Sequence, residues 1–295
     1  MHDAIKRLKA CWNIRRTLYD ADTTQKHLVA ASLELVNTRL ELDYALNETF
    51  RIRSTYLDLI QNCLTGSIYK DPSCTAGEVQ DYDSGTRESG WDWPQNAHTM
   101  IGRKRLENLR LLAESVIGNS VPGDFVETGV WRGGACILMR AVLHAYSVRD
   151  RNVWVADSFA GLPAPNGITY PADSKSKFHE YPELAVSLPE VQENFRAYGL
   201  LDEQVIFLEG WFKDTLPSAG IAQLALIRLD GDMYESTMDG LVNLYPKLSS
   251  GGYIIIDDYH VVPQCKEAVQ DYWRENELAF DLFEIDGVGV YWKKA

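Results

Sequence analysis

From residue 100 onward, short apolar runs alternate with longer segments in which apolar residues recur every three or four positions. The short runs predict β-strands and the longer segments predict amphipathic helices. Strands that alternate with helices indicate βαβ units and a parallel sheet. The expected strands are 123–130, 152–159, 205–212, 224–232 and 251–259, and the expected helices are 102–117, 133–147, 188–200, 236–248 and 264–276.

Two further patterns describe the sheet that these strands form. The runs LALI (224–227) and YIII (253–256) are apolar throughout, which is typical of a sheet covered on both faces. The segments LFEID (282–286) and VGVYWKK (288–294) predict a closing β-hairpin around Gly287. The expected fold class is therefore α/β, Rossmann-like and mostly parallel, with an antiparallel C-terminal strand.

Residues 1–62 follow a different pattern, without proline and with apolar or small residues at a helical spacing. This pattern predicts a helical extension, with Thr24 as a helix N-cap. A second apolar stripe competes with the first, and two interpretations stay open: a helix packed on its own domain, or a dimerising coiled coil. The first stripe comprises Leu28, Ala31, Leu35, Thr38, Leu42, Ala45, Thr49 and Ile52, and the second comprises Leu33, Val36 and Leu40.

Residues 63–100 show neither the apolar runs of strands nor the helical spacing of apolar residues, and they contain several glycines, prolines and aspartates. A loop of this length inside a compact chain is usually functional or disordered. Its aromatic residues, among them Trp91 and Trp93, favour order. We expect this segment to be a lid over an active site, and residues 101–295 to form the catalytic domain.

Composition narrows the classes of protein and partner. The 295 residues are 45% hydrophobic and carry a formal net charge of −13, which disfavours binding to nucleic acid or anionic membranes. No apolar run approaches the roughly 18–20 residues of a membrane span, and the basic N-terminal segment lacks the apolar stretch of a secretory signal. Five scattered cysteines fit a reducing cytoplasm rather than a disulfide framework or zinc site. A homodimer is the expected assembly on general grounds.

The first two predicted strands end in residues that suit a nucleoside ligand. In doubly wound sheets, ligands bind beyond the carboxyl ends of the strands. Glu127 lies in a glycine loop with Gly129, and an acid there disfavours a pyrophosphate and favours a ligand with an ammonium group, such as S-adenosylmethionine. Asp157, which precedes Ser158 at the tip of the second strand, suits ribose hydroxyls, and the alternative is a cap or turn aspartate.

Trp211 follows the third predicted strand, where it could stack on an adenine, line a pocket or pack in the core. The two histidines near strand or helix ends, His98 and His260, could face the same pocket or be structural.

The fourth and fifth predicted strands end in four aspartates: Asp230, Asp232, Asp257 and Asp258. These strands are neighbours in a typical doubly wound sheet, so the carboxylates are expected to converge. Crowded carboxylates repel one another and normally need a cation, and oxygen ligands select a hard metal such as Mg²⁺. An acid left beside the metal could act as a general base on a substrate hydroxyl. The alternative is that these acids are helix caps and salt-bridge partners.

Several long motifs in the same order resemble the macrocin O-methyltransferase family, from about Ile52 to Ala295. The resemblance implies a class I methyltransferase fold with a seven-stranded sheet, and an S-adenosylmethionine-dependent enzyme acting on sugar hydroxyls of macrolides or related glycosidic positions. The motifs are IYKDP (68–72), AHTMIGRKRLENL (97–109), VPGDFVETGVWRGGA (121–135), VADSFAGLP (155–163), LEGWFKDTLP (208–217), RLDGDMYESTMDGL (228–241), NLYPKLSSGGYIIIDDY (243–259) and GVYWKK (289–294).

The resemblance also implies roles for individual residues. It implies a Mg²⁺ site formed by Asp230, Asp257 and Asp258, with Asp232 as the general base. It implies contacts to the methyl donor from Met100, Glu127, Gly129, Asp157, Ser158 and Trp211. The first 51 or so residues exceed what the family contains.

The sequence therefore predicts an S-adenosylmethionine- and Mg²⁺-dependent O-methyltransferase. Its acceptor is expected to be a small molecule that presents a sugar or phenolic hydroxyl. Two alternatives use the same features differently: a metal-dependent hydrolase on the same acid cluster, and a non-catalytic scaffold that acts through the N-terminal helix.

Overall fold

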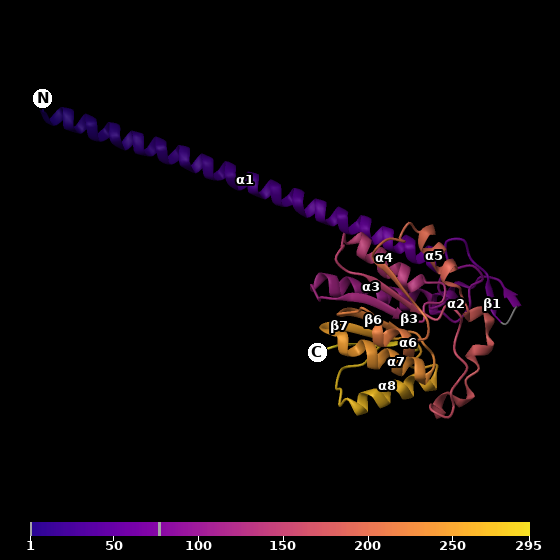
Figure 1. The fold of residues 1–295 in the computed structure, drawn as a ribbon. Helices are drawn as coiled ribbons and strands as arrows, with labels where there is room; N and C mark the ends of the chain where they lie inside the picture. Colours follow the sequence, from indigo (N-terminus) through magenta and orange to yellow (C-terminus); the bar gives the residue numbers. More distant parts are fainter. Residues whose placement is uncertain (1, 76–77) are drawn as a thin grey trace. The chain divides into compact units, whose positions relative to one another are not determined.

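The computed structural model describes residues 2–75 and 78–295, and its centre is a seven-stranded sheet in the order β5-β4-β3-β6-β7-β9-β8 (Figure 1). Strands β3 to β7 pair in parallel, whereas β9 pairs antiparallel with β7 and with β8. The predicted parallel sheet with an antiparallel C-terminal hairpin is confirmed. The strands are β3 (Asp124–Thr128), β4 (Val153–Asp157), β5 (Val205–Glu209), β6 (Leu224–Leu229), β7 (Leu248–Ile256), β8 (Phe283–Glu284) and β9 (Val290–Lys293).

Helices cover both faces of this sheet, as its apolar strands predict (Figure 1). One buried apolar cluster joins the sheet to α3, α4 and α5 through residues such as Leu106, Ile137 and Phe195. A second cluster joins the other face to α7 and α8 through Leu241 and Val269. The helices of this part are α3 (Gly102–Gly118), α4 (Gly134–Ala145), α5 (Leu188–Ala197), α6 (Phe212–Thr215), α7 (Tyr234–Leu244), α8 (Pro263–Glu275) and the short 3₁₀ helices η1 (Pro171–Lys175), η2 (Phe178–Glu180), η3 (Pro182–Leu184), η4 (Leu216–Ser218) and η5 (Tyr245–Lys247).

The N-terminal extension is one continuous helix, α1 (His2–Leu64). The predicted N-cap at Thr24 is wrong, because its hydroxyl donates to the carbonyl oxygen of Asp20 at 2.8 Å inside the helix. Residues up to Thr55 form one compact unit and Tyr56–Ala295 form the other. Within the second unit, the last turns of α1 bury Leu57 and Leu64 in the first apolar cluster. No helix in the described part of the chain is long and apolar enough to cross a lipid bilayer.

The segment expected to be irregular contains the antiparallel strands β1 (Ser73–Thr75) and β2 (Glu78–Gln80) and the helix α2 (Ser84–Ser89). Buried polar contacts fix it. The Arg87 guanidinium pairs with Asp92 at 2.7 Å and donates to the carbonyl oxygens of Thr65 and Asp71. The Asp71 carboxylate accepts from the backbone N–H groups of residues 96 and 97. Opening of this segment as a lid stays a prediction.

Candidate active site

A cavity of about 360 Å³ lies at the carboxyl ends of the parallel strands. The strand order reverses between β3 and β6, which is where doubly wound sheets bind ligands. All ten residues predicted to form the site line this one cavity: Met100, Glu127, Gly129, Asp157, Ser158, Trp211, Asp230, Asp232, Asp257 and Asp258. The structure therefore brings the ten predicted residues together, while their forming a site and the role of each stay predictions.

The loop after β3 approaches the loop after β6 closely. Gly129 has φ of 80°, a conformation that residues with a side chain rarely adopt. A Cβ atom at this position would lie 1.7 Å from the carbonyl oxygen of Asp230. Glycine is therefore required at this position for the loop after β3 (the donor loop) to pack against the loop after β6 (the acidic loop).

Asp157 and Ser158 already organise the turns around them. The Asp157 carboxylate accepts from the backbone N–H groups of Val130 and Phe159, each at 2.7 Å. The Ser158 hydroxyl donates to the carbonyl oxygen of Gly161 at 2.6 Å. Asp157 thus connects the tip of β4 to the glycine loop after β3, and its carboxylate has further lone pairs for a ligand.

Glu127 is buried at the end of β3, where it forms an ion pair with Arg228 and accepts from the Cys136 thiol at 2.8 Å. Burial raises the pKa of Glu127 to about 7, although the Arg228 guanidinium opposes that rise. A cationic ligand group beside Glu127 would favour the carboxylate form.

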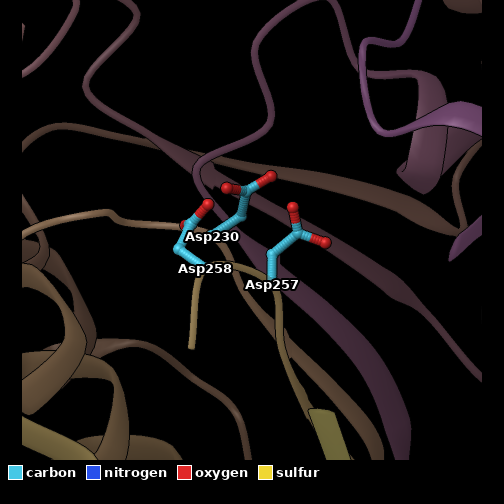
Figure 2. A group of neighbouring side chains, drawn as sticks. All are labelled: Asp230, Asp257 and Asp258. Atoms are coloured by element: carbon cyan, nitrogen blue, oxygen red, sulfur yellow. The ribbon is translucent and has the colours of Figure 1, made fainter. Parts of the chain in front are cut away.

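Three aspartates from two adjacent strand ends converge in the same cavity (Figure 2). Asp230 follows β6, and Asp257 and Asp258 follow β7. Each offers one carboxylate oxygen to a group of three in which all oxygens lie within 4.8 Å of one another. Asp258 Oδ2 is buried and has no hydrogen-bond partner. Buried polar atoms without a partner are rare, so this one indicates an incomplete site.

Two buried arginines hold the acidic residues, and sequence reasoning assigned neither a role. Arg228 pairs with Asp230 at 2.8 Å and also with Glu127 and Asp257. Arg105 pairs with Asp257 and, at 3.1 Å, with Asp286. Arg228 is a charged residue inside an otherwise apolar strand, and that position could have predicted a buried ion pair. Arg105 lies in a helix with several other charged residues, so its sequence gives no such indication.

Burial and the neighbouring charges shift the pKa values of these carboxyl groups in different directions. Burial alone would raise the pKa of Asp257, but Arg105 and Arg228 hold it below its ordinary value. Burial, with the neighbouring acids, raises the pKa of Asp258 well above its ordinary value. Burial and then Asp230 and Asp257 raise the pKa of Asp232 to about 8. Asp232 also has a positive φ of 54°, a strained conformation of the kind found at functional sites.

The remaining wall of the cavity is more varied. It includes Phe178 and the ion pair between Lys213 and Glu235, whose nitrogen and oxygen are 3.4 Å apart. Neither His98 nor His260 lines the cavity. The ring of His98 instead bonds the Tyr198 hydroxyl at 2.8 Å, and His260 lies 3.4 Å from Glu284.

Removing the guanidinium of Arg228 is expected to destabilise the fold. Arg228→Gln leaves the buried carboxyl groups of Glu127 and Asp257, and the half-buried one of Asp230, without their shared cation. Breaking a buried pair in this way costs about 3–5 kcal/mol. Urea denaturation followed by circular dichroism measures the free energy of unfolding. The matched control is Arg196→Gln, because Arg196 pairs with Glu193 on the surface, where such a pair contributes about 0–1 kcal/mol. Equal losses in the two variants would contradict the prediction.

The sequence model of the macrocin O-methyltransferase family matches residues 53–294. The chain belongs to the macrocin O-methyltransferase family. It is 56% identical over 251 residues to the demethyldecarbamoylnovobiocin O-methyltransferase of Streptomyces niveus, covering 84% of this chain and 96% of that protein. It is 52% identical over 243 residues to the 8-demethyl-8-(2,3-dimethoxy-alpha-L-rhamnosyl)-tetracenomycin-C 4′-O-methyltransferase of Streptomyces olivaceus, covering 82% and 93%.

A solved structure, that of the O-methyltransferase NovP, superposes with a TM-score of 0.80. It is 57% identical in sequence, and the match covers 82% of this chain and 99% of NovP. These similarities make this member of the macrocin O-methyltransferase family an O-methyltransferase, and they decide against the hydrolase and scaffold alternatives. The family match begins at residue 53, so nearly all of the first compact unit lies outside the family domain.

Proposed function

We propose that this enzyme transfers a methyl group from S-adenosylmethionine to a sugar hydroxyl of a glycosylated natural product, with Mg²⁺ as a required cofactor. The observation that carries the proposal is the single cavity in which a nucleoside-type half, with Glu127 and Asp157, adjoins an acidic half, with Asp230, Asp257 and Asp258. A methyl donor bound in the first half could therefore transfer its methyl group directly to an acceptor bound in the second half.

The donor half fits a ligand with a positive charge and a ribose. Glu127 is an acid at the end of β3, suited to the ammonium group of the donor. Asp157 lies at the tip of the next strand, where a carboxylate suits ribose hydroxyls. Trp211 and Met100 provide apolar walls of the same cavity. These assignments follow the family resemblance, and the shared cavity supports them.

The acidic half fits a divalent cation. Two guanidiniums face six carboxyl groups here, those of residues 127, 230, 232, 257, 258 and 286. Burial and the neighbouring acids raise the pKa of Asp258 and Asp232, and a cation would favour their carboxylate forms. The unpartnered oxygen of Asp258 also favours a bound cation, and carboxylate ligands select a hard one. Asp230, Asp257 and Asp258 would hold it. A bound Mg²⁺ would supply Lewis acidity, which lowers the pKa of an acceptor hydroxyl.

Asp232 would take the proton from the acceptor hydroxyl. It lines the same cavity, lies outside the group of three converging oxygens, and has a pKa that burial raises into the range of a general base. In the transfer, the S–CH₃ bond of the donor breaks and an O–CH₃ bond forms at the acceptor. The proton goes to Asp232, and the donor leaves as the neutral thioether S-adenosylhomocysteine.

The acceptor would enter along the wall that carries Phe178, Lys213 and Glu235. Polar and charged side chains beside an aromatic ring suit a sugar, which presents hydroxyls on its edges and C–H groups on its faces. One relative is named for methylation of a rhamnosyl group, which supports a sugar acceptor for this enzyme too.

The test has two steps. Calorimetric titration with S-adenosylhomocysteine, with and without Mg²⁺, examines the donor site; no binding by a folded sample would refute the donor. Mass spectrometry then follows methyl gain on glycosides and on their free aglycones, with S-adenosylmethionine and Mg²⁺ present. We expect glycosides alone to gain a methyl group at the sugar. Gain on a phenolic aglycone would refute the sugar acceptor while leaving the methyltransferase assignment intact.

Gly129→Ala is expected to weaken S-adenosylhomocysteine binding by at least about tenfold, equivalent to 1.4 kcal/mol or more. The new Cβ would collide with the Asp230 carbonyl oxygen, so the donor loop must move. Calorimetry measures the change. The control is Gly118→Ala, because a Cβ at Gly118 would meet no atom within 4 Å beyond its own stretch of helix, and that variant should bind as the parent does. Unchanged binding by Gly129→Ala would show that the loop does not contact the donor.

A further inference from the structure

Helix α1 exposes many large apolar side chains in the part that precedes Tyr56–Ala295, the catalytic unit. Leu28, Leu35 and Leu42 are 64%, 75% and 57% exposed, and Ile14 and Leu18 are exposed to a similar extent. None of the side chains of residues 11–55 is buried. An apolar surface of this extent on one helix marks an interaction surface rather than a solvated face.

Some of these side chains, together with small residues, form two columns along one side of the helix, which we name the seam. Large residues recur every seventh position at Ile14, Leu28, Leu35 and Leu42, interrupted by Ala21. Three positions after each of these five residues, Ala21 included, lies a small residue: Thr17, Thr24, Ala31, Thr38 and Ala45. A repeat of seven with alternate spacings of three and four is that of a coiled coil.

The alternation of large and small residues decides how two such helices pack. In a parallel pair, each residue meets its own copy, so leucine meets leucine and alanine meets alanine. In an antiparallel pair, the large column of one helix faces the small column of the other, which fills space evenly. One alignment then sets Leu28 opposite Ala31, Leu35 opposite Thr24 and Leu42 opposite Thr17. It also sets Ile14 opposite Ala45, and only the layer of Ala21 and Thr38 pairs two small residues.

The charge of the helix favours the same direction. Residues 9–19 contain Lys9, Arg15 and Arg16 and no acid, whereas residues 41–48 contain Glu41, Asp43 and Glu48 and no base. The antiparallel alignment brings the basic stretch of each chain beside the acidic stretch of the other, and a parallel one brings like beside like. One like-charged pair, Asp20 and Glu41, would flank the seam at the exposed edge, where solvent screens it.

We propose that residues 9–52 of α1 dimerise the enzyme by pairing antiparallel with the same helix of a second copy, through the seam. The family match begins at residue 53, and the relatives are covered almost completely by the rest of the chain, so the part of α1 before that residue is not needed to complete the family's catalytic fold. A second copy is the partner that supplies both the complementary column and the complementary charge.

Disulfide trapping in the full chain tests the pairing and its direction. The exposed Cys11 is first changed to Ser, and Leu35→Cys and Thr24→Cys are then made in separate chains with tags of different size. After mixing and mild oxidation, we expect a disulfide between the two different chains. It should form at least about tenfold faster than between two copies of either one, because pairing raises the effective concentration of opposed thiols. Trapping of Leu35→Cys with itself would indicate parallel pairing and overturn the proposal.

The second stripe provides a matched control for the seam. Adding Leu28→Asp and Leu42→Asp to both chains should abolish trapping and lower the mass measured by light scattering. Adding Leu33→Asp and Leu40→Asp, which changes equally exposed leucines off the seam, should preserve both. Far-ultraviolet circular dichroism checks that the catalytic unit stays folded in each variant. Equal trapping in the two sets, or none in the unaltered pair, would overturn the proposal.

Discussion

Replacing Asp232 with asparagine is expected to lower kcat for methyl transfer by about 10²–10⁴-fold, the range that one general base contributes. Asparagine has a similar shape but cannot accept the proton of the acceptor hydroxyl. It also tolerates the left-handed backbone conformation that Asp232 adopts, so the loop should keep its form. Steady-state kinetics at saturating donor measures the loss, and calorimetry should show unchanged binding of S-adenosylhomocysteine.

Asp281→Asn is the control, because Asp281 is an exposed aspartate that does not line the cavity. It should retain the kcat of the parent enzyme. If Asp232→Asn also retained it, the proton would have to leave by another route and the assignment of the base would fail. If donor binding were lost together with turnover, the residue would act in shaping the loop rather than in proton transfer.

Asp258→Asn is expected to weaken the response to Mg²⁺ by about 100-fold or more, since even residues that only support metal ligands contribute 10–100-fold. Asp258 is the informative choice because arginines hold the other two acids. Changing Asp257 would also remove a counter-charge from the buried Arg105 and Arg228. Asp258 has one buried oxygen with no partner, so its replacement should leave the thermal midpoint of unfolding nearly unchanged. Initial rates across a Mg²⁺ titration measure the effect.

Metal removal should reproduce that effect in the unaltered enzyme. Treatment with EDTA is expected to reduce its rate to the level of Asp258→Asn, and added Mg²⁺ should restore it. Asp150→Asn, an exposed change far along the chain from the cluster, should titrate as the parent does. Activity that persists in EDTA would refute the metal requirement while leaving methyl transfer itself untouched.

The sheet and its helices could be predicted because the spacing of apolar residues within each segment indicates its secondary structure. The runs LALI (224–227) and YIII (253–256) are apolar throughout, and Ile227 and Ile255 are buried in the strands that they form. The Thr24 cap failed for a local reason as well. A threonine can satisfy its hydroxyl on the preceding turn, and without Gly or Pro nearby nothing interrupts the helix.

What the sequence did not predict depends on contacts between distant residues. The order within residues 63–100 comes from the buried pair of Arg87 and Asp92, which periodicity cannot register. The acids of the site were found because topology brings the carboxyl ends of parallel strands together. Their partner Arg105 comes from a helix, and Asp286 comes from the closing hairpin. No pattern in the intervening sequence predicts that they meet.

The position of Arg228 has a thermodynamic consequence. One guanidinium serves as counter-charge both to Glu127, on the donor side, and to Asp230 and Asp257, on the acidic side. A cationic ligand on either side competes with that guanidinium for its acids, and the guanidinium then acts more strongly on the other side. The two binding equilibria are therefore linked. Whatever factor the donor imposes on the affinity for a cation, the cation must impose on the affinity for the donor.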